Sequence, residues 1–133
     1  GFFKDFVVES DGRHTRVINI KRRGTAPLAD LIRVHALAIG SESLNSFDRL
    51  NDIIDAAILP LGRGQDLNDA LEFICMVRAR HQADDLAAGV EPDNSIDPEK
   101  LSEFERKSLR DAFLILGNAQ KFLKYRYQPG RAN

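Results

Sequence analysis

The sequence predicts a mainly α-helical protein, an antiparallel four-helix bundle preceded by an N-terminal β-hairpin. Two observations favour this fold. Apolar residues repeat at helical spacing through four stretches after Pro27, and two β-like runs before residue 25 flank an Asp-Gly turn signal. With 133 residues the chain is long enough to bury one core without disulfides or metal. We therefore expect a single domain, residues 1–133, with the hairpin in 1–24 and the bundle in 25–128.

The predicted hairpin pairs residues Phe2–Glu9 with residues Thr15–Lys21 through a turn at Ser10-Asp11-Gly12. Because two strands alone are only marginally stable in water, we expect the hairpin to pack against the helices or against another domain. The chain opens on Gly1, without a methionine or a signal-peptide pattern, and the pair Phe2-Phe3 follows at once. We interpret the chain as a piece of a longer multidomain protein.

The first three helices are predicted from apolar residues spaced three or four apart. The first starts near Thr25 and Pro27, ends at Gly40, and carries Leu28, Leu31, Ile32, His35 and Ile39. The second is capped by Asn45 or Ser46, ends at Pro60 and Gly62, and carries Leu44, Phe47, Leu50, Ile54 and Ile58. The third continues to about Ala88 and carries Leu67, Leu71, Ile74, Val77 and Leu86.

A capping box from Ser102 to Glu105 announces the fourth helix, in which each of the two side chains satisfies a free amide of the first turn. Its apolar stripe runs to about Tyr127 and consists of Phe104, Leu109, Ala112, Phe113, Leu116, Leu123 and Tyr127. Between the third and fourth helices, residues 89–95 are mostly turn formers without a period. We expect a mobile loop there.

The composition argues against several classes of protein. The chain has 19 basic and 20 acidic residues, which does not favour attraction to an anionic membrane. Cations interleave with aromatic residues over 121–127, but the same charge balance argues against a nucleic-acid surface. Apolar runs reach five residues, against the roughly 20 that span a bilayer. The single cysteine, Cys75, lies in an apolar run, so we expect it to be buried in a cytoplasmic protein.

The basic segment Lys21-Arg22-Arg23-Gly24 is the most distinctive feature of the chain, because three cations leave an apolar strand and meet a glycine turn and a helix start. Such an arrangement can hold a phosphate. Alternation along a strand places Lys21 and Arg23 on the face of Asn19, and Arg22 on the opposite face, so the strand alone cannot direct all three to one ligand. A solvated strand end and a docking surface for another domain are the alternatives.

The helices carry further candidate polar residues. We expect His35 to be a hydrogen-bonded core residue, although a site between helices could use it together with Arg33. Arg49 precedes the apolar Leu50 and suits either an ion pair at the bundle edge or a substrate contact.

A third group of polar residues lies on the third predicted helix. Arg78, His81 and Gln82 are three and four residues apart and therefore converge on one helix face. They could form a buried polar network or bind substrate.

Catalytic chemistry is not indicated. The chain lacks a matching set of catalytic carboxylates, and its serines have no histidine at a meaningful spacing. His81, Asp84 and Asp85 are neighbours on a helix, but without a second histidine or a cysteine they are a weak signal for a metal site. We predict no catalytic residue, metal or cofactor in this chain.

Several stretches together resemble the nucleotidyltransferase substrate-binding domain family. They are residues 18–24, 30–37, Arg49-Leu50, 78–82 and Pro92-Asp93-Asn94, and the resemblance covers nearly the whole chain. It implies a helical bundle that forms the C-terminal domain of a bacterial signalling protein and follows a nucleotidyltransferase domain. Cyclic-nucleotide-binding or cystathionine-synthase-type regulatory domains would lie further upstream. One departure is Asn19, where the family pattern leads us to expect an acidic residue that could pair with Lys21.

The resemblance implies a non-catalytic accessory domain that helps to hold a nucleotide or an acceptor substrate, while the transferase domain supplies the carboxylates and any Mg²⁺. The candidate substrate-binding residues are Lys21, Arg22, Arg23, Arg33, Arg49, Arg78, His81 and Gln82. The alternative is an interaction module that dimerises or relays a signal from the upstream domains. A ligand site requires cations around a concave pocket, whereas an interaction module requires an exposed apolar patch.

Overall fold

The computed structural model describes residues 8–10 and 16–128, and four α-helices make up most of this part of the chain. They are α1 (Ala26–Ala38), α2 (Ser46–Asp55), α3 (Arg63–Ala87) and α4 (Glu103–Tyr127). Two short strands, β1 (Ile18–Asn19) and β2 (Ser95–Ile96), form an antiparallel sheet with Ile18 opposite Ile96. The predicted mainly helical class is confirmed.

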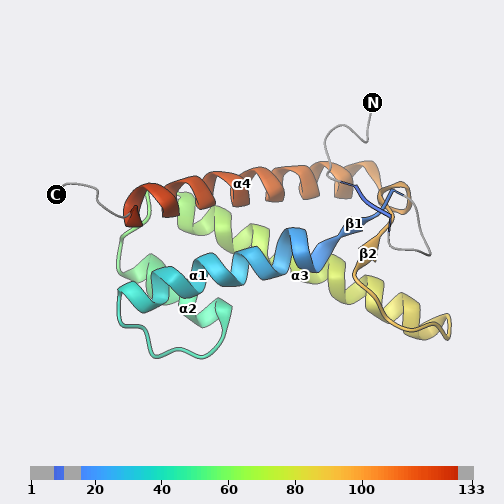
Figure 1. The fold of residues 1–133 in the computed structure, drawn as a ribbon, viewed down its shortest axis with the longest axis horizontal. Helices are drawn as coiled ribbons and strands as arrows, with labels where there is room; N and C mark the ends of the chain where they lie inside the picture. The colour runs from blue at the N-terminus through green and yellow to red at the C-terminus, as the bar shows by residue number, and fades with distance from the viewer. Residues whose placement is uncertain (1–7, 11–15, 129–133) are drawn as a thin grey trace.

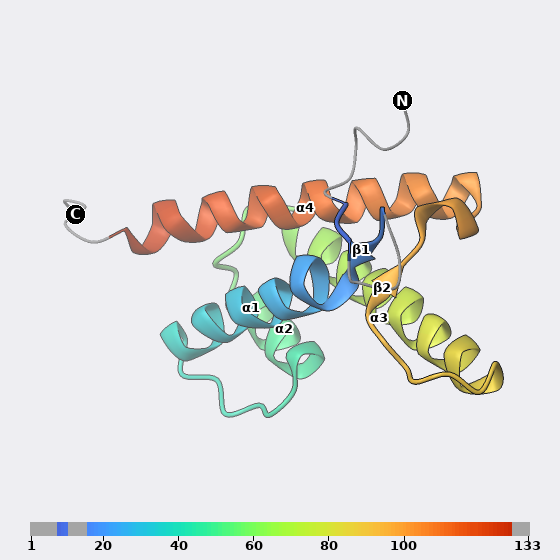
Figure 2. The ribbon, with the colours of Figure 1, turned by 45° about the vertical axis from the view of Figure 1, so that its right-hand side comes forward.

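The long helices α3 and α4 pack against each other and run in opposite directions (Figure 1). Helix α1 packs against α4 and α2, and α2 also contacts α3. In both views α2 lies on the side of α1 that faces away from α4, while the small sheet lies at the end of α1 where that helix begins (Figure 2). The arrangement places the two ends of α1 in different surroundings.

The hydrophobic core lies between these elements and includes both strands. Its fully buried side chains include Ile18, Ile20, Leu28, Ile32, Leu50, Ile53, Ile74 and Leu109. In α2 the buried residues are the predicted Leu50 and, in place of the predicted Ile54, Ile53; Ile54 is 37% exposed. Phe104, predicted in the stripe of α4, is 77% exposed because it lies in the first turn, beyond the end of the core. Burial of apolar surface is what holds these short elements together.

The predicted helix boundaries agree with the structure at most ends. Asn45 caps α2 by accepting a hydrogen bond from the Asp48 amide at 2.9 Å. Ser102 and Glu105 form the predicted capping box at the start of α4. No helix in the described part of the chain is long and apolar enough to cross a membrane.

The prediction of a strand over Thr15–Lys21 is wrong at its C-terminal end. The backbone turns helical at Ile20, and Lys21–Thr25 form a single turn of π-helix, η2, that continues into α1. The Asn19 side chain accepts a hydrogen bond from the Arg22 amide at 2.9 Å, so the residue that departs from the family pattern satisfies a free amide of this first turn. Gly24 is therefore a buried helical residue and not a turn.

The partner of β1 also differs from the prediction. Of the predicted hairpin, residues 1–7 and 11–15, including part of the turn, lie outside the described residues. The described contact between its two halves is an antiparallel bridge in which Glu9 and Val17 exchange two hydrogen bonds of 2.9 Å. β1 itself pairs with β2, which lies at the end of the region predicted to be an unstructured loop. A short 3₁₀ turn, η3 (Pro98–Lys100), then leads to α4.

Candidate functional site

Polar side chains near the C-terminal end of α3 hold the segment that precedes β2. The Arg78 Nε donates a hydrogen bond of 2.9 Å to Asn94 Oδ1, and Gln82 Nε2 donates to the same oxygen at 3.2 Å. The main-chain oxygen of Asn94 accepts from the Ile20 amide at 2.9 Å. The predicted convergence of Arg78, His81 and Gln82 is confirmed, and Asn94 joins this face of α3 to the start of η2.

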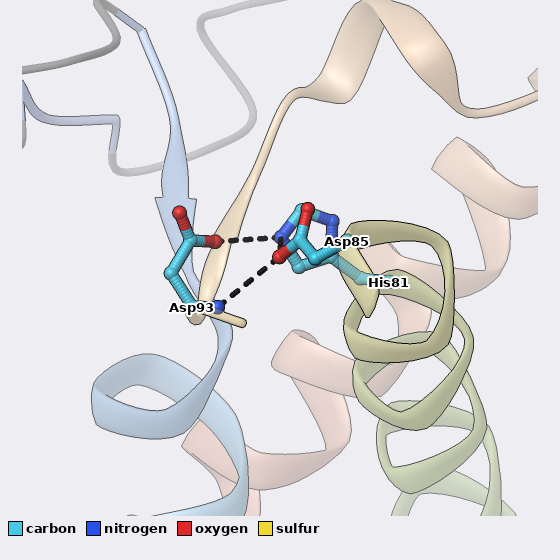
Figure 3. A group of neighbouring side chains, drawn as sticks. All are labelled: His81, Asp85 and Asp93. Atoms are coloured by element: carbon cyan, nitrogen blue, oxygen red, sulfur yellow. Dashed lines mark hydrogen bonds and ion pairs between the residues drawn. The ribbon is translucent and has the colours of Figure 1, made fainter. Parts of the chain in front are cut away.

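His81 lies beside two carboxylates in the same place (Figure 3). Its Nε2 is 2.7 Å from Asp93 Oδ1 and 3.2 Å from Asp85 Oδ2. Because both neighbours are acceptors, Nε2 carries the ring proton and donates it to them. Asp85 also accepts from the Asp93 amide at 3.1 Å, and Asp93 Oδ1 accepts from the Ser95 amide at 3.0 Å. We call His81, Asp85 and Asp93 the His-Asp cluster.

The basic segment Lys21–Arg23 lies on the surface of η2. All three side chains are exposed, and Arg22 forms an ion pair with Glu9. Because the backbone is helical, the predicted strand alternation of Lys21 and Arg23 against Arg22 is wrong. Arg22 and Arg23 border a hollow of about 300 Å³ on α4 whose other lining residues are Pro27, Phe113, Leu116, Gly117 and Gln120.

A second hollow, of about 320 Å³, lies between the C-terminal end of α1, the start of α3 and α4. We call it the His35 pocket. Its walls are mainly apolar, and its polar lining comes from His35, Arg63, Asn118 and Lys121; the apolar lining is Leu59, Pro60, Leu67, Ile115, Ala119 and Phe122. Its volume is at the lower end of the range for small-molecule sites, about 300–1,000 Å³.

His35 is buried at this pocket, as predicted for a core histidine with a hydrogen bond. Its Nδ1 lies 3.0 Å from the Tyr127 hydroxyl, and its ring packs near the Phe122 ring with 6.0 Å between centroids. Burial lowers the pKa of His35, and the charge of Arg126 lowers it further. The imidazole is therefore held neutral and available for hydrogen bonding at neutral pH.

A family profile described as "Putative nucleotidyltransferase substrate binding domain" matches residues 1–127. The chain belongs to this family. No curated protein and no solved structure matches the chain. The substrate-binding domain is thus identified by its family, while the residues that would bind a substrate have to be inferred from the geometry.

Two of the predicted site residues of this substrate-binding domain lie apart from the others. Arg49 is half-buried, and its Nε donates a hydrogen bond of 2.9 Å to the Ser43 main-chain oxygen, which takes the place of the carboxylate expected for an ion pair. Arg33 is exposed on α1 and lines none of the three places described above. The eight predicted residues of the substrate-binding domain therefore do not converge on one pocket.

Sequence reasoning missed Arg63 and Asn118 at the His35 pocket and missed the role of Asp93. The sequence marks Lys121 and Phe122 only as part of the run of cations and aromatic residues over 121–127, which does not indicate a pocket. For Asn118, Lys121 and Phe122, a signal in the sequence is their position one helix turn or less from apolar residues of the α4 stripe.

The single cysteine of the substrate-binding domain is a weak candidate for a nucleophile. Cys75 is half-buried, and burial raises the pKa of its thiol, which outweighs the opposing effect of Arg78. Such a thiol is mostly protonated at neutral pH and is a poor nucleophile.

Proposed function

We propose that this chain is a non-catalytic accessory domain that holds a nucleotide for a nucleotidyltransferase domain of the same cytoplasmic signalling protein. The observation that carries the proposal is the His35 pocket, with apolar walls for a base and two cations at its edge. The family to which the chain belongs is described as substrate-binding, which supports the same function.

The lining of the His35 pocket matches the parts of a nucleoside phosphate. Phe122 and Ile115 offer apolar and aromatic surface against which a base can lie. Asn118 carries both a donor and an acceptor for the edge of a base, and the Arg63 guanidinium and Lys121 ammonium suit the phosphates. Each hydrogen bond from a charged group contributes about 1.5–3 kcal/mol.

The experiment is calorimetric titration of the chain with the four ribonucleoside triphosphates, with and without Mg²⁺. We expect binding that the double variant Arg63→Ala/Lys121→Ala weakens by about 100-fold or more, since two charged contacts are lost. The matched control is Lys100→Ala/Lys107→Ala, which removes two exposed cations of η3 and α4 and should leave the affinity unchanged within about twofold.

A second double variant, Lys21→Ala/Arg23→Ala, decides between the two hollows. Both side chains are exposed, so this variant should keep its thermal stability. If it loses binding while Arg63→Ala/Lys121→Ala keeps it, the nucleotide binds at the basic segment and the pocket assignment is wrong. If no nucleotide gives heat with the wild-type chain, the proposal of a self-contained nucleotide site is wrong.

A further inference from the structure

We propose that the His-Asp cluster binds one divalent transition-metal ion, with Zn²⁺ as the reference ion. The cluster lies between α3 and the segment that precedes β2 and lines neither the His35 pocket nor the hollow beside the basic segment. The inference is therefore independent of nucleotide binding.

The geometry of the cluster suits a small cation. One ligand atom from each residue, Nε2 of His81 and a carboxylate oxygen of Asp85 and of Asp93, lies within 4.8 Å of the other two. Ligand atoms around a tetrahedral ion with bonds of about 2.0–2.1 Å lie roughly 3.3 Å apart. The two carboxylate oxygens lie 2.7 and 3.2 Å from Nε2, so these two of the three separations are already close to this value.

The backbone also brings the three ligands from two rigid places. His81 and Asp85 are four residues apart on α3 and so lie one above the other on one face. Asp93 is held opposite them, because its amide donates to Asp85 and its carboxylate accepts from the Ser95 amide that begins β2. A metal ion would thus bind to ligands that are already positioned.

The charge and the type of the ligand atoms select the class of ion. In the ion-free protein a single ring proton on Nε2 faces two carboxylates. A divalent cation can take the place of that proton at Nε2 when the proton moves to Nδ1, which leaves the ring neutral, and the two charges of the ion match the two carboxylates. Imidazole nitrogen favours transition metals such as Zn²⁺ and Co²⁺ over Mg²⁺ and Ca²⁺, which prefer oxygen ligands.

Solvent access at the cluster is intermediate, which suits an ion with an open position. The side chains of His81, Asp85 and Asp93 are 24%, 16% and 21% exposed. Three protein ligands leave one tetrahedral position for water or for an external ligand.

An ion in the cluster would brace the neighbouring backbone. Asp93 precedes Asn94, whose main-chain oxygen binds the Ile20 amide at the start of η2. An ion that fixes Asp93 to α3 therefore also limits the movement of Asn94 and of the start of η2, from which the basic segment continues. We expect slower hydrogen exchange of the Ile20 amide when the site is filled.

The test is titration of the full chain with Zn²⁺, Co²⁺, Mn²⁺ and Mg²⁺ by calorimetry, with the visible absorption of bound Co²⁺ as an independent signature. We expect one Zn²⁺ per chain and a tetrahedral Co²⁺ spectrum. His81→Gln keeps a hydrogen-bond donor but removes the nitrogen ligand, and it should weaken Zn²⁺ binding by more than the roughly 10-fold to 100-fold that loss of an outer partner costs. The matched control, Asp84→Asn, removes a neighbouring exposed carboxylate and should change the affinity less than about twofold.

Two outcomes would overturn the proposal. One is the absence of Zn²⁺ binding tighter than about 1 mM. The other is binding that His81→Gln leaves unchanged, which would assign the ion to other residues. Circular dichroism establishes that His81→Gln is folded. If it is not, Asp93→Asn, which keeps an oxygen that accepts hydrogen bonds but removes the negative charge, takes its place and must show the same loss of Zn²⁺ binding.

Discussion

Replacing Gly24 with alanine tests the close approach of η2 to α3. Gly24 is buried in a helical turn, and a Cβ added there would lie 2.8 Å from Ile74 Cγ2, with Ile74 Cδ1 at 3.5 Å and Ile20 Cδ1 at 3.7 Å. Ile74 is fully buried. Its Cγ2 is attached directly to a branched Cβ, so this methyl group cannot swing away without a change of χ1.

Two opposing terms set the size of the effect. Alanine is favoured over glycine in a helix interior by up to about 1 kcal/mol. Overpacking of a dense core costs about 1–3 kcal/mol, because neighbours must leave their rotamers or the helices must separate. The overlap falls on a buried and stiff side chain, which places the cost in the upper part of that range. We expect Gly24→Ala to lower the free energy of unfolding by about 1–2 kcal/mol.

Urea denaturation followed by circular dichroism measures this change, and the chain supplies a matched control. Gly117 lies inside α4, and a Cβ added to it would have open space within 4 Å, so Gly117→Ala should stabilise by about 0.5–1 kcal/mol. Ile74→Leu removes the branch at Cβ while conserving volume, and combined with Gly24→Ala it should recover part of the loss in a double-mutant cycle. A Gly24→Ala protein as stable as wild type would refute the close approach of η2 to α3.

Three further changes test other parts of the structure. The pKa of His35 is lowered in the folded state, so the unfolded chain takes up a proton first, and stability should fall as the pH drops below about 6.5. In urea titrations at several pH values, His35→Gln should remove that part of the slope, and an unchanged slope would contradict it. Ser102→Ala removes the cap of α4 and should lower the melting temperature through a loss of about 1 kcal/mol. Asn94→Ala leaves Arg78 and Gln82 without their shared acceptor and should cost about 1–3 kcal/mol in urea denaturation, whereas Asn94→Asp, which keeps the acceptor, should not.

The four helices could be predicted because their signals are local. Leu28 and Ile32 repeat at helical spacing, and the Ser102–Glu105 capping box lies within one turn. The spacing of apolar residues does not predict whether Ile53 or Ile54 is buried, since both lie on the same side as Leu50 in a helix of ten residues. Only the packing of α2 against α1 and α3 decides which of the two is buried.

The sheet could not be predicted, because its signal is not local. β1 and β2 have two residues each, and their pairing joins distant parts of the sequence. Ile18 and Ile20 alternate with Asn19, which is typical of a strand, but Ile20 already belongs to the helical turn. The close approach of Gly24 to the buried Ile74 side chain favours glycine there, whereas the local sequence is equally typical of a glycine turn.

The candidate sites follow the same division between local and distant signals. Spacing alone brought Arg78, His81 and Gln82 to one face of α3, and the structure confirms it. The acceptors that complete this face, Asp93 and Asn94, come from another segment, as do the residues of the His35 pocket. The binding roles of the basic residues stay predictions, because no ligand contact defines them.

One continuous stretch connects the places that could bind a ligand. The basic segment lies in η2, which continues directly into α1, and α1 carries His35 near its other end. At the start of this stretch, the Ile20 amide is bound to Asn94, which α3 holds through Arg78 and Gln82. A change at the His-Asp cluster therefore reaches the basic segment through one main-chain hydrogen bond and the β1–β2 pair. The His35 pocket is built from the far end of α1 together with α3 and α4, so its affinity for a nucleotide should not depend on metal at the cluster.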